Sequence, residues 1–124
     1  MISAPLAFFI AGSIGSFVSV VHGILIQRNI VGPFFEGASQ PASTRRLLAV
    51  LMQFSTFCWF LGGVGLMVAP QFFSLPEQSM LAKIVAIFYI YGALGNFWAT
   101  KGRHPGWILL AISVGLILYG LWVM

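Results

Sequence analysis

Residues 2–27 read ISAPLAFFIAGSIGSFVSVVHGILIQ and contain no charged side chain before Arg28. A helix needs roughly 20 apolar residues to cross the hydrocarbon core of a bilayer, so this stretch is long enough to span a membrane. Comparable apolar stretches follow at 47–69, 81–100 and 107–124. With their flanking residues, the four stretches predict an all-α membrane protein with transmembrane helices over about 2–27, 45–69, 75–101 and 105–124. The short connections favour two helical hairpins packed as a bundle.

The composition supports a single transmembrane domain covering residues 1–124. Hydrophobic residues make up 60% of the chain and charged residues only 6%, against roughly 25% in soluble domains. Lipid solvates apolar side chains, so a protein in a bilayer does not need a charged surface. The net charge of +4 comes from basic residues scattered between apolar stretches rather than gathered in a patch. We therefore expect the lipid bilayer as a partner and no nucleic acid.

The charges predict the direction of the chain through the membrane. The first connection holds Arg28, Arg45 and Arg46, and the third holds Lys101 and Arg103. Basic residues are enriched in cytoplasmic loops, so both of these connections are expected on the cytoplasmic side. Both termini then lie outside the cytoplasm.

The start of the third helix carries its own signal in Ser74-Leu75-Pro76-Glu77. This sequence matches a capping box, with proline in the first turn where its missing N–H costs nothing.

Two segments of the chain resemble each other. Residues 8–17 read FFIAGSIGSF and residues 88–97 read FYIYGALGNF, with half of the positions identical. A duplicated hairpin would relate the halves by a pseudo-two-fold axis along the membrane normal, as in parallel-repeat transporters. Coincidence is the alternative, because Gly, Phe and Ile are abundant in membrane helices.

Small residues form one face on the first and third predicted helices. At 100° per residue, Gly12, Gly15 and Ser19 share an arc of the first helix, and Gly92 and Gly95 share one on the third. Small residues let helix backbones approach closely in lipid, so these five residues are predicted to pack helices together. A pore or substrate path along the same faces is the alternative.

Three polar side chains are predicted to lie at one depth inside the membrane. His22 lies six residues from Arg28, Gln53 seven from Arg46 and Asn96 five from Lys101, which places each roughly 8–10 Å inside the boundary. Unpartnered polar groups are costly in hydrocarbon, so His22, Gln53 and Asn96 are expected to face one another. The cluster is either a structural hydrogen-bond network or a binding or proton-handling site in which His22 titrates.

The sequence does not favour catalysis, a metal or a cofactor. The only carboxylates, Glu36 and Glu77, fall in connections on opposite sides, so no carboxylate pair or Ser-His-Asp triad can form. Haem ligation by two histidines would need His104 beside His22. His104 is instead expected at the interface near the start of the last helix. Two histidines and Cys58 are too few ligands for a structural metal.

The pairs His22-Gly23 and Gly32-Pro33, and the stretch Gly102-Arg103-His104-Pro105-Gly106-Trp107, resemble features of small bacterial four-helix membrane proteins of no assigned activity. The resemblance implies residence in the bacterial inner membrane and lends no functional residue. The small faces, the short connections and the absence of catalytic groups lead us to expect a non-enzymatic membrane subunit or accessory protein. Such a protein would act through helix contacts with itself, as a homo-oligomer, or with a larger complex. The alternative is a small oligomeric transporter or channel for a solute or proton, with its polar site around His22.

Overall fold

A computed structural model of the chain describes residues 1–37 and 39–124. The described residues form helices and connections without a β-strand. The helical elements are α1 (Ala4–Ile26), a π-helical segment η1 (Gln27–Val31), α2 (Gly32–Gly37), α3 (Ala42–Phe72), α4 (Leu75–Thr100) and α5 (Gly106–Trp122). Because α1, η1 and α2 are continuous, these elements make four helices, and the predicted all-α class is confirmed.

The first helix does not end near residue 27 as predicted, but continues to Gly37 over 34 residues. Arg28 lies inside the π-helical segment, where the N–H of Gly32 donates to the carbonyl of Gln27, five residues earlier. The wide turn precedes Pro33, whose ring would collide with the carbonyl four residues earlier in a regular α-helix. The connection expected from the sequence over residues 28–44 is therefore mostly helix.

The second helix is also longer than predicted, since α3 covers 31 residues from Ala42 to Phe72. The helix was expected to end at residue 69, but it continues through Pro70, which lies inside the last turn. A proline removes one backbone hydrogen bond from a helix. This loss does not end α3 at Pro70, because the helix continues for only two more residues.

The third and fourth helices begin and end close to the predicted residues. The capping box is confirmed, because the backbone N–H and hydroxyl of Ser74 donate to Glu77 Oε2 at 2.8 and 2.7 Å. Lys101 and Gly102 end α4 with left-handed φ angles of 51° and 75°. The last helix, α5, has 17 residues, or about 25 Å at 1.5 Å per residue.

Three of the helices, Ala4–Gly37, Ala42–Phe72 and Leu75–Thr100, are long and apolar enough to cross a membrane. The chain is accordingly a membrane protein. The fourth crossing, by the shorter apolar helix α5, stays a prediction.

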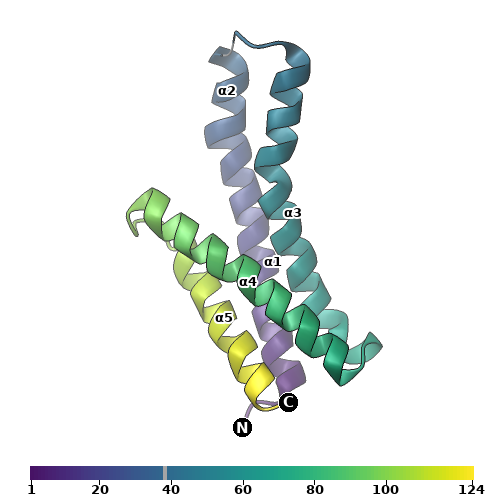
Figure 1. Cartoon of the computed structure of the whole chain (residues 1–124). Helices are drawn as coiled ribbons and strands as arrows, with labels where there is room; N and C mark the ends of the chain where they lie inside the picture. The colour runs from purple at the N-terminus through teal and green to yellow at the C-terminus, as the bar shows by residue number, and fades with distance from the viewer. Residues whose placement is uncertain (38) are drawn as a thin grey trace.

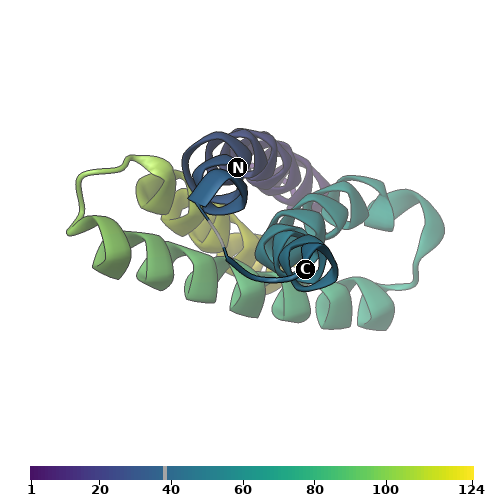
Figure 2. The same ribbon diagram turned by 90° about the horizontal axis from the view of Figure 1, so that it is seen from above.

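The long helices α1 and α3 lie side by side, and α4 runs obliquely across them (Figure 1). The last helix, α5, then returns beside α1 and α4, so that the two chain termini lie at the same end (Figure 1). Seen from above, α4 lies against α3 and α5, and α1 lies on the other side of these two helices (Figure 2). The largest fully buried side chains form the core between these helices: Phe8, Leu66, Tyr89, Leu110 and Ile117.

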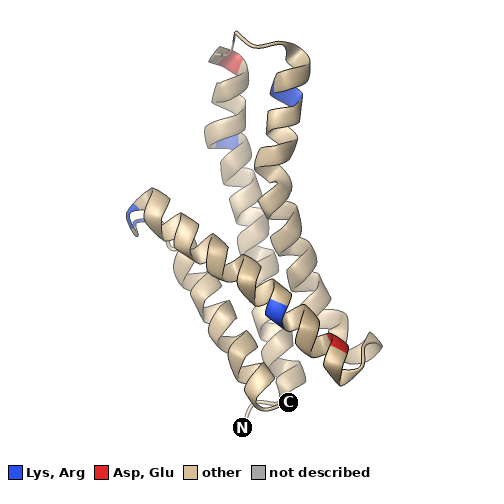
Figure 3. Ribbon diagram, in the orientation of Figure 1, with Lys and Arg blue, Asp and Glu red and all other residues tan. Residues whose placement is uncertain are grey.

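Most basic residues lie on the half of the molecule that is remote from the two termini (Figure 3). They belong to η1, to the start of α3 and to the α4–α5 connection, while Lys83 lies within α4. The oblique path of α4 brings the α4–α5 connection beside the middle of the long helical pair rather than beside its tip (Figure 1). This placement puts the residues of that connection next to α1.

Candidate functional site

His22 lies on α1 and faces protein, as the sequence predicts. Its imidazole packs against the indole of Trp59 on α3, with ring centroids 4.6 Å apart and the planes tilted by 40°. Trp59 is itself buried. One face of His22 is therefore held by a rigid aromatic neighbour, while the rest of the ring stays open to a cavity.

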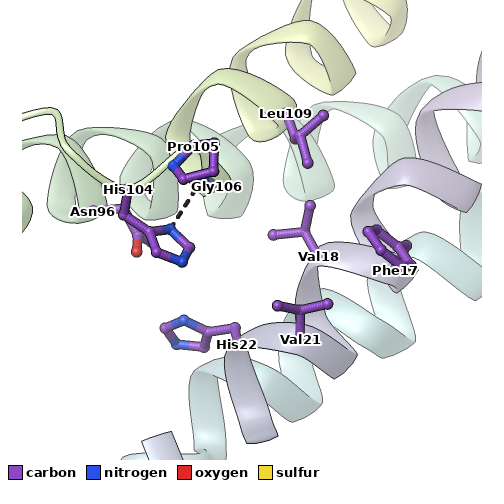
Figure 4. A pocket seen from close by; sticks show the side chains of 9 residues that line it. All are labelled: Phe17, Val18, Val21, His22, Asn96, His104, Pro105, Gly106 and Leu109. Atoms are coloured by element: carbon purple, nitrogen blue, oxygen red, sulfur yellow. Dashed lines mark hydrogen bonds between the residues drawn. The ribbon is translucent and has the colours of Figure 1, made fainter. Parts of the chain in front are cut away.

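The cavity has a volume of about 200 Å³ and lies between α1, the end of α4 and the start of α5. Figure 4 shows the rings of His22 and His104 facing each other across it, with Asn96 beside His104. Apolar side chains from α1 and α5 form the other end. The full lining is Phe17, Val18, Val21, His22, Asn96, His104, Pro105, Gly106 and Leu109.

The expected position of His104 needs correction. The sequence placed it near the same membrane face as His22 but at the interface rather than at the same depth, whereas the two imidazoles line one cavity. Its conformation is set locally, because the backbone N–H of Gly106 donates to His104 Nδ1 at 3.1 Å. The oblique path of α4 explains why His104 lies near His22. It brings the α4–α5 connection, which contains His104, beside α1 (Figure 1).

The three polar residues expected to cluster do not all meet. Asn96 lines the cavity with His22, and its Nδ2 donates to the carbonyl of Gly92 at 2.9 Å on its own helix. Gln53 instead donates to the carbonyl of Gly23 at 3.1 Å and lies 3.4 Å from Gln27 Oε1. Consecutive residues of a helix point about 100° apart. Gly23 therefore faces Gln53 on α3, while the preceding residue, His22, faces the cavity.

The glycine and serine faces behave differently on the two helices. Gly12 packs against the backbone of Gly63 on α3, Gly15 lies against Tyr89, and Ser19 is fully buried. On α4, Gly92 lies against the Trp59 indole, as a packing residue should. Gly95 packs against no other helix of the same chain, because it is exposed and a Cβ built on it meets no described heavy atom within 4 Å beyond its sequence neighbours and the backbone of its own helix. A packing role for Gly95 therefore stays a prediction for a contact with another chain.

The two similar segments do not occupy equivalent environments. Phe8 is fully buried, whereas its counterpart Phe88 is 41% exposed. The next pair is reversed, with Phe9 52% exposed and Tyr89 fully buried. A duplicated hairpin would place such pairs alike, so the internal repeat stays a prediction that these environments do not support.

Several functional residues escaped the sequence reasoning. Trp59 and Tyr89 resemble ordinary interfacial aromatics in the sequence, yet Tyr89 donates its hydroxyl to the carbonyl of Trp59 at 3.1 Å in the core. Val21 is an ordinary apolar residue in the sequence, yet it lines the cavity. The turn Gly102–Gly106 was the one available signal for His104, since its glycines allow a compact reversal.

The described residues contain no group of three or more His, Cys, Asp or Glu side chains placed to hold a metal ion. The cavity thus offers two imidazoles, one amide and a largely apolar wall. Such an arrangement suits an uncharged or weakly polar molecule that a few hydrogen bonds orient.

No protein-family model matches the chain, and comparisons with curated proteins and with solved structures find no match either.

Proposed function

We propose that this chain is a non-enzymatic integral membrane subunit that acts through contacts between its outward helix faces and another helix, in a second copy or in a larger complex. The observation that carries the proposal is a set of small residues left bare on α4 and α5. Gly95 and Gly115 are both exposed, and a Cβ added at either meets no described heavy atom within 4 Å beyond its sequence neighbours and the backbone of its own helix.

Each bare glycine is four residues from an exposed alanine. Gly95 pairs with Ala99 on α4, and Ala111 pairs with Gly115 on α5. Bulky exposed side chains stand beside the first pair, with Tyr91 78% and Trp98 82% exposed. A glycine inside a helix costs about 1 kcal/mol relative to alanine, and in lipid this small-residue spacing allows close helix association. Contact with a further helix would explain these exposed small residues, because they allow two helix backbones to approach closely, and contact with lipid does not require them.

The double variant Gly95→Leu/Gly115→Leu is expected to weaken association at least about tenfold, because a leucine at either position holds the partner helix away. Fluorescence energy transfer between labelled copies in liposomes measures self-association, and the proteins that co-purify in mild detergent report a larger complex. Helix content by circular dichroism should not change, because the added side chains meet open space in the monomer.

The matched control changes bulky exposed residues on the same two helices, as Leu94→Phe and Leu118→Phe, which are 64% and 54% exposed in the wild type. These variants should associate like the wild type. A wild-type chain that is monomeric and purifies without any partner would contradict the proposal.

A second candidate function is transport of a solute or proton by an oligomer, which the cavity between His22 and His104 favours. Between the cavity and the end of the molecule that holds the termini, the core is filled by fully buried apolar residues, including Phe8, Leu110 and Ile117. A path across the membrane would therefore have to form between copies of the chain. Solute or proton flux into liposomes that contain only this protein separates a transporter from an accessory subunit.

We further propose a bacterial inner-membrane location with both termini outside the cytoplasm. The termini share one end of the molecule, and the hydroxyl of Tyr119 donates to the carbonyl of Ile2 at 3.1 Å. The helix Ala4–Gly37, about 51 Å long at 1.5 Å per residue, exceeds a hydrocarbon core of about 30 Å. Its arginine-bearing end then projects on the cytoplasmic side.

Labelling of single cysteines tests this orientation after Cys58→Ser removes the native thiol. A cysteine at Ser39, in the α2–α3 connection, should resist an impermeant thiol reagent in intact cells. A cysteine at Gln71, near the α3–α4 connection, should react. Both wild-type residues are exposed, so protection reports the side of the membrane rather than burial in the protein. The reverse pattern would invert the proposed orientation.

A further inference from the structure

The cavity between His22 and His104 has a polar end and an apolar end. The two imidazoles and Asn96 lie at one end, next to the α4–α5 connection, and Phe17 and Leu109 lie at the other (Figure 4). Phe17 is 64% exposed, so the apolar end opens toward lipid. This polarity matches a lipophilic molecule with an oxygen at one end and a hydrocarbon tail that leaves through the open side.

The hydrogen bond from Gly106 decides what His104 can do in the cavity. A backbone N–H can only donate, so His104 Nδ1 accepts and carries no proton. The neutral ring therefore bears its proton on Nε2, which points toward His22 (Figure 4). A protonated Nε2 is a hydrogen-bond donor and not a metal or haem ligand. The cavity consequently selects a molecule with an acceptor oxygen.

The charge of the lining indicates which acceptor it takes. None of the described residues that line the cavity is Lys, Arg, Asp or Glu. A carboxylate buried without a cationic partner costs far more than an uncharged carbonyl, which needs only a hydrogen bond. A neutral carbonyl oxygen is thus the better match to the Nε2–H of His104, with His22 able to contribute a second hydrogen bond from the opposite wall.

The size of the cavity limits the ligand to about one ring. A dry cavity of about 150 Å³ accommodates benzene, and this one has a volume of about 200 Å³. We propose that the cavity binds the ring of a lipid-soluble 1,4-quinone. One carbonyl accepts the hydrogen bond from His104 Nε2, and the ring packs between Val18 and Leu109. The inference does not depend on association between copies of the chain.

The two imidazoles report binding directly, because the chain has only two histidines. With ¹⁵N-labelled histidine and the full chain in nanodiscs, a decyl-substituted 1,4-benzoquinone is expected to shift the signals of both rings saturably. Decylbenzene has the same hydrocarbon body without the oxygens, and it should leave the rings unchanged. Equal shifts with decylbenzene would overturn the proposal, because an apolar site without hydrogen-bond selection would then suffice. Shifts with decanoate but not with the quinone would overturn it in favour of an acidic lipid, and no shift with any of the three would also overturn it.

Two substitutions separate the effect of the Nε2–H donor of His104 from the effect of its hydrogen bond with the Gly106 N–H. His104→Asn retains an oxygen near the position of Nδ1, able to accept from Gly106, but loses the Nε2–H. Its affinity for the decyl quinone should fall about tenfold, the loss of one hydrogen bond. His104→Gln retains an N–H near the position of Nε2 and should bind within about threefold of the wild type. Both affinities can be followed through the remaining histidine, His22. Equal affinity in the wild type and His104→Asn would exclude His104 as the donor.

Discussion

Replacing Gly15 with leucine is expected to undock α4 from the long helical pair and to lower the free energy of unfolding by at least about 3 kcal/mol. A Cβ added at Gly15 would overlap the phenol of Tyr89, which is fully buried. The phenol cannot move aside without losing the hydrogen bond from its hydroxyl to the carbonyl of Trp59. Titration of a mild-detergent sample with a denaturing detergent, followed by circular dichroism, measures the change.

The control for this substitution is Gly95→Leu, which adds the same side chain to a glycine that faces open space. In the isolated chain, where no partner helix covers Gly95, it should leave the unfolding transition within about 0.5 kcal/mol of the wild type, as for other surface changes. If Gly15→Leu were as stable as Gly95→Leu, the contact of the Tyr89 phenol with α1 at Gly15 would be wrong.

Replacing Trp59 with alanine is expected to cost about 3–5 kcal/mol, the range for removing a large buried aromatic side chain. The indole fills the space against Gly92 on α4, where its Cε2 lies 2.8 Å from a Cβ built on that glycine. It also supports the imidazole of His22 at 4.6 Å. The variant should therefore unfold earlier in the same titration and also bind the decyl quinone more weakly than the wild type.

The matched substitution is Trp98→Ala, because Trp98 is 82% exposed and Trp59 only 5%. Removing Trp98 should change neither the unfolding transition of the isolated chain nor the shifts of the two imidazoles. Equal losses of stability and quinone binding in both variants would contradict the packing of the Trp59 indole between α1, α3 and α4.

The course of the backbone was largely predictable where local physics decides it. The capping box at Ser74 and Glu77 predicted the start of α4 within one residue, because its hydrogen bonds involve only neighbours in the chain. The helix ends predicted at Arg28 and Pro70 were wrong, because neither residue alone decides where its helix stops. An arginine ends an apolar stretch without weakening the helix, and a proline weakens a helix only locally. The helices therefore continue, through a π-helical turn at Gln27–Val31 in the first and with Pro70 in the last turn of the second.

The candidate site was predictable in depth but not in direction. Counting from Arg28 and Lys101 placed His22 and Asn96 at one level, and the structure brings both to one cavity. The same counting grouped Gln53 with them and left His104 out, although Gln53 bonds to Gly23 and His104 faces His22. Depth follows from a rise of about 1.5 Å per residue, whereas the neighbours of a side chain depend on how the helices rotate and cross.

By itself, the sequence determined that this protein is helical, enters a membrane and has a basic side. These properties follow from the length of apolar stretches and the position of charges, which each segment carries without the others. The tertiary structure alone decided that Gly15 meets Tyr89, that Gly95 faces outward and that His104 joins His22. Most positions of these helices are apolar, so lipid-facing and protein-facing residues differ little in hydrophobicity. The angle at which α4 crosses the α1–α3 pair therefore selects the partners, and that angle depends on the packing of all the helices together.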